Sequence, residues 1–304
     1  MPEPKPGPGL RAVARSMRLP FLVLTPVCVL LGVALAVRAR GTPELGELAL
    51  VLIGACCAHL SVNLLNEHVD FRSGLDARTV RTPFSGGSGA LLDHPTAAST
   101  VLRVGILCLC ATIAVGLYLV LVQGPALLPI GLLGVFVVLA YSPWLNRDPL
   151  LCLLAPGIGF GPVMVIGTSL VLSGDYLADA VLLSLVPFFT CNNLLLLNQL
   201  PDLEADRSVG RNHLAIALGV TMALRVYLAF CVAAAAVIVL TSRFADMPCT
   251  LLLALLPLSL SLPAALGIRG WLRHDEGLVR ALALNVLVAI LTPLTLALVL
   301  LLEA

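Results

Sequence analysis

The chain has 304 residues, of which 59% are hydrophobic and 12% are charged, and its mean hydropathy is +1.04. The charged share is about half of that in an ordinary soluble domain. A soluble core could not bury so much apolar surface, so the composition excludes a soluble protein and predicts an integral membrane protein. The net charge of +1 provides no basic surface, so we expect no nucleic-acid partner.

Nine apolar stretches are compatible with membrane spans, each of which takes about 20 helical residues. They are residues 19–37, 48–65, 99–122, 126–141, 150–172, 180–200, 214–240, 249–268 and 278–302. Turn-forming residues separate them, for example Gly41-Thr42-Pro43 and Gly124-Pro125. The alternation over ~10 residues that marks a membrane β-barrel strand is missing. The sequence therefore predicts an all-α, polytopic membrane protein with about nine transmembrane helices.

The basic residues indicate how these helices are oriented. The sequence has 18 lysines and arginines. If nine spans alternate in direction, all of them fall on one side except Arg38, Arg40 and Arg243. Because cytoplasmic loops collect positive charge, we expect the N-terminus and the richer side to be cytoplasmic. We also expect residues 1–18 to form a cytoplasmic N-terminal tail and residues 19–304 a single transmembrane domain, in the cell (inner) membrane.

A first polar cluster follows the second apolar stretch, at residues 61–89, and reads SVNLLNEHVDFRSGLDARTVRTPFSGGSG. Asn66 and Asp70 are four residues apart, which places both on one face of a helix. Asp76 adds a further carboxylate. Three arginines are candidates for phosphate contacts: Arg72, Arg78 and Arg81. The glycine-rich end, residues 85–89, could turn backbone N–H groups toward an anion and cover a diphosphate, although a flexible linker would have the same composition.

A second polar cluster follows the sixth apolar stretch, at residues 192–211, and reads NNLLLLNQLPDLEADRSVGR. Asn198 and Asp202 repeat the four-residue spacing on the expected helix face, and Asp206 adds another step of four. Pro201 should break or kink the helix and so aim Asp202 and Asp206 into a cavity. Two arginines about one turn apart could neutralise phosphate oxygens: Arg207 and Arg211.

Both clusters open on the same side of the membrane, where Asp70, Asp76, Asp202, Glu204 and Asp206 gather. Carboxylates gathered in this way repel one another unless cations join them. Oxygen ligands of Asn and Asp suit Mg²⁺, which also takes substrate phosphates. The alternative is that these acids form ordinary salt bridges with the arginines of the same loops. We expect the two clusters to face each other and to hold Mg²⁺ around the diphosphate of a substrate.

The two clusters resemble the motifs of a known family. Asn66-Glu67-His68-Val69-Asp70 with Asp76 is similar to the first Asp-rich motif of the UbiA superfamily of membrane prenyltransferases, and Asp202-Leu203-Glu204-Ala205-Asp206 is similar to the second. The resemblance covers nearly the whole chain. The residues around the motifs and Phe160–Thr168 are most similar to the menaquinone-type branch, which prenylates 1,4-dihydroxy-2-naphthoate. Glu67 and His213 depart from the residues that many relatives carry at these positions.

This resemblance implies a fold and a reaction. The helices would surround a central cavity that opens to the cytoplasm and to the bilayer. The partners would be a polyprenyl diphosphate donor, an aromatic acceptor and membrane lipids, and the cofactor would be Mg²⁺. Mg²⁺ and arginines would stabilise the charge on the diphosphate as the allylic C–O bond ionises, and an electron-rich ring would attack the cation. In the menaquinone-type reaction the ring also loses its carboxylate.

The same resemblance assigns roles to the residues of the clusters. The expected Mg²⁺ ligands are Asn66, Asp70, Asp202 and Asp206. The expected catalytic carboxylates are Asp70, Asp76, Asp202 and Asp206. The expected substrate-binding residues are Asn63, Arg72, Arg78, Arg81, Tyr141, Asn198, Arg207 and Arg211. Among these, Asp76 and Arg81 are candidates for orienting or deprotonating the acceptor.

Other interpretations stay open from the sequence. Tyr141 could be an interfacial anchor, and Asn63 could form a helix–helix hydrogen bond. The same fold could act on another acceptor, such as 4-hydroxybenzoate, homogentisate, a phenazine precursor or a glycerol phosphate lipid. A secondary transporter, which is often built from two similar halves, could also carry acids within the membrane. Here, however, the acids gather at one rim and no lone charge lies in the middle of a span.

Overall fold

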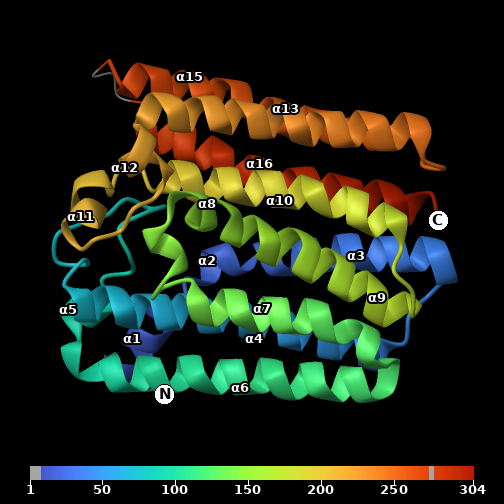
Figure 1. The fold of residues 1–304 in the computed structure, drawn as a ribbon, viewed down its shortest axis with the longest axis horizontal. Coiled ribbons are helices and arrows are strands. Elements are labelled where there is room, and N and C mark those ends of the chain that lie inside the picture. The colour runs from blue at the N-terminus through green and yellow to red at the C-terminus, as the bar shows by residue number, and fades with distance from the viewer. Residues whose placement is uncertain (1–7, 274–276) are drawn as a thin grey trace, which may run out of the picture.

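The computed structural model describes residues 8–273 and 277–304, and every regular element in these residues is helical (Figure 1). Residues 1–7 of the expected tail lie outside the described residues. The α-helices are α1 (Pro8–Ser16), α2 (Leu19–Leu22), α3 (Leu24–Arg40), α4 (Leu45–Ser73), α5 (Ala90–Asp93), α6 (Ala98–Gln123), α7 (Leu128–Ala140), α8 (Pro149–Ile158), α9 (Gly167–Ser173), α10 (Ala178–Asn198), α11 (Leu203–Ser208), α12 (Leu214–Leu218), α13 (Val220–Phe244), α14 (Leu255–Ser259), α15 (Ser261–Trp271) and α16 (Leu278–Leu302). Short 3-10 or π-helical segments are η1 (Pro95–Ala97), η2 (Pro125–Leu127), η3 (Leu145–Arg147), η4 (Gly159–Ile166) and η5 (Cys249–Ala254).

Helical segments of membrane-spanning length account for most of the chain. Within the described residues, eight are long and apolar enough to cross a bilayer: Gly9–Arg40, Leu45–Ser73, Pro95–Gln123, Pro149–Ser173, Ala178–Asn198, Val220–Phe244, Cys249–Trp271 and Leu278–Leu302. A shorter apolar helix, Pro125–Ala140, lies at the position of the fourth expected span. The expected all-α membrane architecture is confirmed, and the chain is an integral membrane protein.

The segment before the first expected span contains a packed helix. Ala12 of α1 is fully buried and belongs to the same apolar cluster as Leu64 of α4 and Leu91 of α5. Arg15 of the same helix pairs with Asp93 of α5 at 2.6 Å. These contacts hold α1 against the end of the bundle where α4 finishes.

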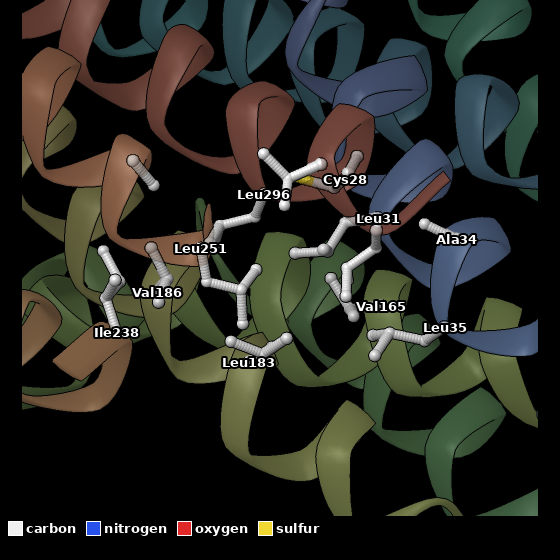
Figure 2. Close-up of a cluster of buried hydrophobic side chains, with 14 of the residues drawn as sticks. Cys28, Leu31, Ala34, Leu35, Val165, Leu183, Val186, Ile238, Leu251 and Leu296 are labelled. Atoms are coloured by element: carbon white, nitrogen blue, oxygen red, sulfur yellow. The ribbon is translucent and has the colours of Figure 1, made fainter. Parts of the chain in front are cut away.

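The largest apolar core joins helices that are far apart in the sequence. It includes Leu31 of α3, Leu183 of α10 and Leu296 of α16, all of which are fully buried, and Figure 2 shows these side chains gathered together. Close helix approach also depends on small residues, as is common in membranes. At Gly161 of η4, an added Cβ would lie 2.5 Å from the carbonyl oxygen of Ser184, so only glycine lets η4 pack this tightly on α10.

Both polar clusters lie at one end of the bundle, where Figure 1 shows α5, α11 and α12 together. Helix α4 ends at Ser73 and is followed by Gly74, whose φ of 74° favours glycine. Helix α10 ends at Asn198. Helices α3 and α13, which carry Arg38, Arg40 and Arg243 in their last turns, finish at the opposite end. The fold therefore separates the basic residues between the two ends of the bundle in the way the span count predicts.

Candidate active site

Arg211 joins the two polar clusters directly. Its guanidinium pairs with Asp70 of the first cluster, and its Nη1 lies 3.0 Å from Asp206 Oδ1 of the second. The side chain of Arg211 is 20% exposed, whereas those of Asp70 and Asp206 are 7% and 2% exposed. The two polar clusters therefore meet at a largely buried position, which is the convergence that the sequence predicts.

The first cluster follows the expected helical geometry. Asn66 and Asp70 lie one turn apart on α4, and Asn66 Nδ2 donates to Asp70 Oδ2 at 2.8 Å. Ser142, after α7, donates to Asn66 Oδ1 at 3.0 Å. Because α4 continues without a break to Ser73, the four-residue spacing places both side chains on one face. The carboxamide is thus held in a fixed orientation next to the carboxylate.

The second cluster departs from the expected geometry. Asn198 is the last residue of α10, and Asp202 precedes the separate helix α11, so this pair does not share a helix face as predicted. Pro201 explains the difference, because it lacks an N–H donor and its ring blocks the continuing helix. The new helix begins with Asp206 N donating to Asp202 O at 2.8 Å. The break turns Asp202 and Asp206 to the cavity, as the position of Pro201 predicts.

The glycine-rich segment connects the two clusters. Gly86 N donates to Asp202 Oδ2 at 2.9 Å, so the loop after α4 contacts the loop after α10. Gly86 and Gly87 have φ values of 81° and 70°, which L side chains rarely adopt. At Gly87 a Cβ would also lie 2.6 Å from Asp76 Oδ1. These residues line the cavity next to the carboxylates. This is the position at which we expected the glycine-rich segment to cover a diphosphate.

The predicted site residues divide into two groups. Those that line the cavity are Asn63, Asn66, Asp70, Asp76, Tyr141, Asn198, Asp202, Asp206 and Arg211. Those that are exposed and outside its lining are Arg72, Arg78, Arg81 and Arg207. Arg78 Nη1 donates to Ser208 Oγ at 2.9 Å, and Arg207 pairs with the exposed Glu204 at 3.2 Å. For Glu204 and Arg207, the simpler interpretation as a loop salt bridge describes the structure.

Three further residues belong to this end of the cavity. Glu67 is fully buried, accepts a hydrogen bond from Ser88 N at 3.2 Å and lies 3.4 Å from Arg18. Among the described residues outside glycine, Arg18 alone has a positive φ, 50°. His213 Nε2 lies 3.3 Å from Asp206 Oδ2 and is 1% exposed. In the sequence, Glu67 stood out as a departure from the motif, although its burial was not predicted. No local pattern marked Arg18.

The charges at the mouth are unbalanced. The five carboxylates that the structure buries in its described residues are Glu67, Asp70, Asp76, Asp202 and Asp206. Burial, followed by the charges of Glu67 and Asp70, raises the pKa of Asp76 to about 7. Burial and the charge of Asp206 raise the pKa of Asp202 to about 6. For Arg211, burial lowers the pKa, but the charges of Asp70 and Asp206 outweigh it, so the pKa is raised and the guanidinium stays charged.

Several buried oxygens in this region fit a divalent cation. Asp76 Oδ2, Asn198 Oδ1 and Asp202 Oδ1 have no hydrogen-bond partner, although buried polar atoms normally have one. No group of three or more His, Cys, Asp or Glu side chains in residues 8–273 and 277–304 is placed to hold a metal ion by itself. Mg²⁺, however, usually binds one or two carboxylates and completes its shell with waters and substrate phosphates. The mixed Asn and Asp oxygens therefore fit Mg²⁺ bound together with a phosphate group.

The mouth leads into a cavity of about 490 Å³. On α4 its lining runs from Asp70 to Val51, and on the other side it includes Leu119 of α6 and Leu128 of α7. At 1.5 Å per residue, Asp70 and Val51 are separated by roughly 28 Å along the helix, which is close to the hydrocarbon thickness of a bilayer, about 30 Å. A polar mouth with a long apolar chamber suits a ligand that has an anionic head and a hydrocarbon tail.

Comparisons with known proteins agree with this architecture. The sequence model of the UbiA prenyltransferase family matches residues 25–276. The 1,4-dihydroxy-2-naphthoate octaprenyltransferase of Bacillus subtilis (strain 168) is 29% identical over 200 residues, which are 64% of this chain and 61% of that relative. The match thus spans less than two thirds of the relative's length.

Solved structures share the fold at low identity. A UbiA homolog from Archaeoglobus fulgidus, bound to DMAPP and Mg²⁺, has a TM-score of 0.67 and 12% identity and covers 94% of this chain and 99% of its own. An apo UbiA homolog from Aeropyrum pernix K1 has a TM-score of 0.65 and 18% identity, with 88% of this chain and 94% of its own covered. Because the family model matches most of the chain, this protein belongs to the UbiA prenyltransferase family.

Proposed function

We propose that this chain transfers a polyprenyl group, in a Mg²⁺-dependent reaction within the membrane, from an allylic diphosphate to an aromatic acceptor, 1,4-dihydroxy-2-naphthoate. The observation that carries the proposal is the meeting of both Asp-containing clusters at Arg211, at the mouth of an apolar chamber. Family membership supports prenyl transfer. The Bacillus relative supports the naphthoate acceptor, and the Archaeoglobus homolog, bound to DMAPP and Mg²⁺, supports the donor and the metal.

In this proposal Asn66, Asp70, Asp202 and Asp206 would hold Mg²⁺ with the help of Asn198, and the metal would supply positive charge for the departing diphosphate. Arg211 is oriented by Asp70 and Asp206 and would add a second, fixed positive charge beside the oxygens of the diphosphate. The backbone of Gly86 and Gly87 closes the mouth over the head group. The surrounding helices keep water away from the allylic carbon, so the cation formed there survives until the ring reaches it.

The bond changes follow from the donor and the acceptor. The allylic C–O bond breaks and its electron pair leaves with the diphosphate, and a ring carbon of the acceptor then forms the new C–C bond. The ring carbon that forms this bond gives up a proton as the ring becomes aromatic again. With 1,4-dihydroxy-2-naphthoate, the ring carbon that carries the carboxylate also loses CO₂, keeps the electron pair of that bond and takes up a proton. Asp76, whose pKa is raised to about 7, suits transfer of a proton near neutral pH. We assign it, with Tyr141, to the acceptor side; Arg81, which was expected there too, lies outside the cavity lining.

The direction of the chain in the membrane is also part of the proposal. Because the end with both clusters carries most of the arginines, the positive-inside rule places it and the N-terminus in the cytoplasm. In a bacterial cell this corresponds to the inner membrane, with lipids around the outer helix faces. Cysteine-scanning with a membrane-impermeant reagent tests the orientation. Labelling at Arg207→Cys from the outside of intact cells would contradict it.

The acceptor is tested with purified protein and labelled polyprenyl diphosphate. The acceptors are 1,4-dihydroxy-2-naphthoate, 4-hydroxybenzoate, homogentisate, a phenazine carboxylate and glycerol phosphate, each with Mg²⁺ or with EDTA. We expect a Mg²⁺-dependent, decarboxylated prenyl naphthol product. Transfer to a different acceptor alone would overturn the naphthoate assignment. Mg²⁺-independent uptake of a solute by vesicles, with no prenyl transfer, would contradict the proposed enzymatic activity and support a transporter instead.

A further inference from the structure

The walls of the cavity differ in chemistry. On the side of α6 and α7, its lining residues are aliphatic or small, with Thr112 as the polar exception. On the side of α2, α4 and η4, the lining includes three ring side chains: Phe21, His59 and Phe160. A flexible isoprenoid tail suits the first wall, whereas a flat aromatic molecule suits the second, because aromatic rings pack favourably edge to face.

His59 lies in the interior of this aromatic wall. On α4 it precedes Asn63, Asn66 and Asp70 by 4, 7 and 11 residues, a spacing that keeps all four on the cavity side of the helix. All four line the cavity. Seven residues at 1.5 Å each place His59 roughly 10 Å deeper than Asn66. His59 is therefore within reach of a ring that reacts just inside the mouth.

The imidazole is held in place from two sides. Its Nδ1 lies 2.8 Å from Thr25 Oγ1 of α3, and Thr25 is fully buried. Phe160 packs edge-on to the ring, with the centroids 5.0 Å apart and the planes at 80°. Thr25 occupies one nitrogen and fixes the ring orientation, so Nε2 is the nitrogen available for another partner. A fixed polar group of this kind is what orients a ligand in a mostly apolar pocket.

A titratable side chain inside a membrane span is costly and usually functional. His59 is 6% exposed and lies in the middle part of α4. Several described residues of α4 line the cavity deeper than Asn63. Among them His59 alone has a titratable side chain, and the others are apolar or small. A purely structural role would be served at lower cost by an apolar residue, as at Ala55 and Ala58 of the same helix.

From this arrangement we infer that His59 binds the aromatic acceptor: its Nε2 hydrogen-bonds a polar ring substituent, and the acceptor ring lies against Phe160, while the prenyl tail lies along the aliphatic residues of α6 and α7. This inference rests on the proposed function, because it takes the acceptor to be an aromatic ring with hydroxyl or carboxyl groups. It adds an acceptor-binding residue outside the two Asp-containing clusters and assigns the two substrates to different walls.

The test compares four variants by steady-state kinetics with 1,4-dihydroxy-2-naphthoate, while donor and acceptor are varied separately. His59→Leu removes both nitrogens, His59→Gln keeps a polar group, and Thr25→Val releases the ring. The matched control is His68→Leu, because His68 is also on α4 but its Nδ1 lies 3.2 Å from Ala98 O and it does not line the cavity.

We expect His59→Leu to raise the acceptor KM about tenfold, as the loss of one hydrogen bond would, and to leave the donor KM within twofold. His59→Gln should recover part of the loss, and Thr25→Val should raise the acceptor KM by a smaller factor. The His68→Leu control should match the wild type.

An acceptor KM within twofold of wild type in a folded His59→Leu protein, or an equal rise in both KM values, would overturn the inference. If His59→Leu does not fold, Thr25→Val and His59→Gln decide: unchanged acceptor KM in both contradicts it.

A binding measurement separates this inference from the proposed function. A bound acceptor raises the melting temperature of the folded protein, so the rise caused by 1,4-dihydroxy-2-naphthoate is measured without any donor. A rise in the wild type that is lost in His59→Leu supports the binding role even if no prenyl transfer is found, in which case the proposed function alone fails. The same rise in both proteins contradicts the role of His59 and leaves the proposed function standing. No rise in either protein contradicts the acceptor site itself.

Discussion

Removal of the Arg211 side chain should destabilise the protein more than removal of any exposed arginine. In Arg211→Met, the carboxylates of Asp70 and Asp206 lose their shared partner while their side chains remain 7% and 2% exposed. Breaking a buried ion pair by deletion of one partner typically costs about 3–5 kcal/mol, because a buried charge is left uncompensated. For a domain of 150–250 residues, each kcal/mol lowers the melting temperature by roughly 2–4 °C. We therefore expect a fall of about 6 °C or more.

The assay is thermal unfolding of purified protein in detergent without Mg²⁺, followed by tryptophan fluorescence. Arg207→Met is the control, because Arg207 pairs with Glu204 at exposed positions, with side chains 57% and 87% exposed, and such pairs contribute about 0–1 kcal/mol. The double variant Arg211→Met/Asp206→Asn should recover part of the loss, because one of the two unpaired charges is gone. A melting temperature of Arg211→Met equal to that of Arg207→Met would refute the argument.

Three further predictions concern the same end of the bundle. Asp70→Ala and Asp202→Ala should each abolish prenyl transfer while the protein still inserts and folds, and full activity of either purified variant in Mg²⁺ would contradict the metal assignment. Because the pKa of Asp76 is raised to about 7 from 3.8, the folded state holds this proton more tightly than the unfolded state. Asp76 should therefore contribute a loss of stability in the metal-free protein as the pH rises from about 4 to 7, with a slope of at most about 1.4 kcal/mol per pH unit from this one group, and Asp76→Asn should remove that contribution in melting curves. Gly87→Ala should reduce turnover several-fold, because its φ of 70° and the contact with Asp76 disfavour a Cβ, whereas Gly46→Ala, where a Cβ meets open space, should not.

Local sequence patterns predicted the features that depend on neighbouring residues. Asn66 and Asp70 share a helix face because α4 continues past both of them. The same spacing failed at Asn198 and Asp202, because Pro201 between them ends α10 and lets α11 begin in a new direction. The presence of Pro201 was sufficient to predict the break. A four-residue spacing across a proline should therefore be treated as two separate segments.

The features that the sequence could not predict depend on partners far along the chain. Arg211 was expected to contact phosphate, but the structure also pairs it with Asp70, 141 residues away. Glu67 receives its hydrogen bonds from Ser88, and His59 is oriented by Thr25 on another helix. No periodicity or spacing encodes such contacts, since they arise only when the bundle packs. In contrast, the positions of the apolar helices depend on local hydropathy, which is why they were predicted.

The excess of negative charge at the mouth explains why a site of this kind would need metal ions. Five buried carboxylates lie close to Arg18 and Arg211, so their negative charge exceeds the positive charge of these two arginines. Burial, together with this excess of negative charge, raises the pKa values of Asp76 and Asp202. A diphosphate is itself an anion and would be repelled by the same carboxylates. Divalent cations bound at the mouth would attract both the carboxylates and the diphosphate, and so offset both repulsions. The mouth would therefore bind the metal–diphosphate complex in preference to the free anion. Release of the diphosphate with its metal ions would restore the unfavourable negative charge, which favours binding of the next complex.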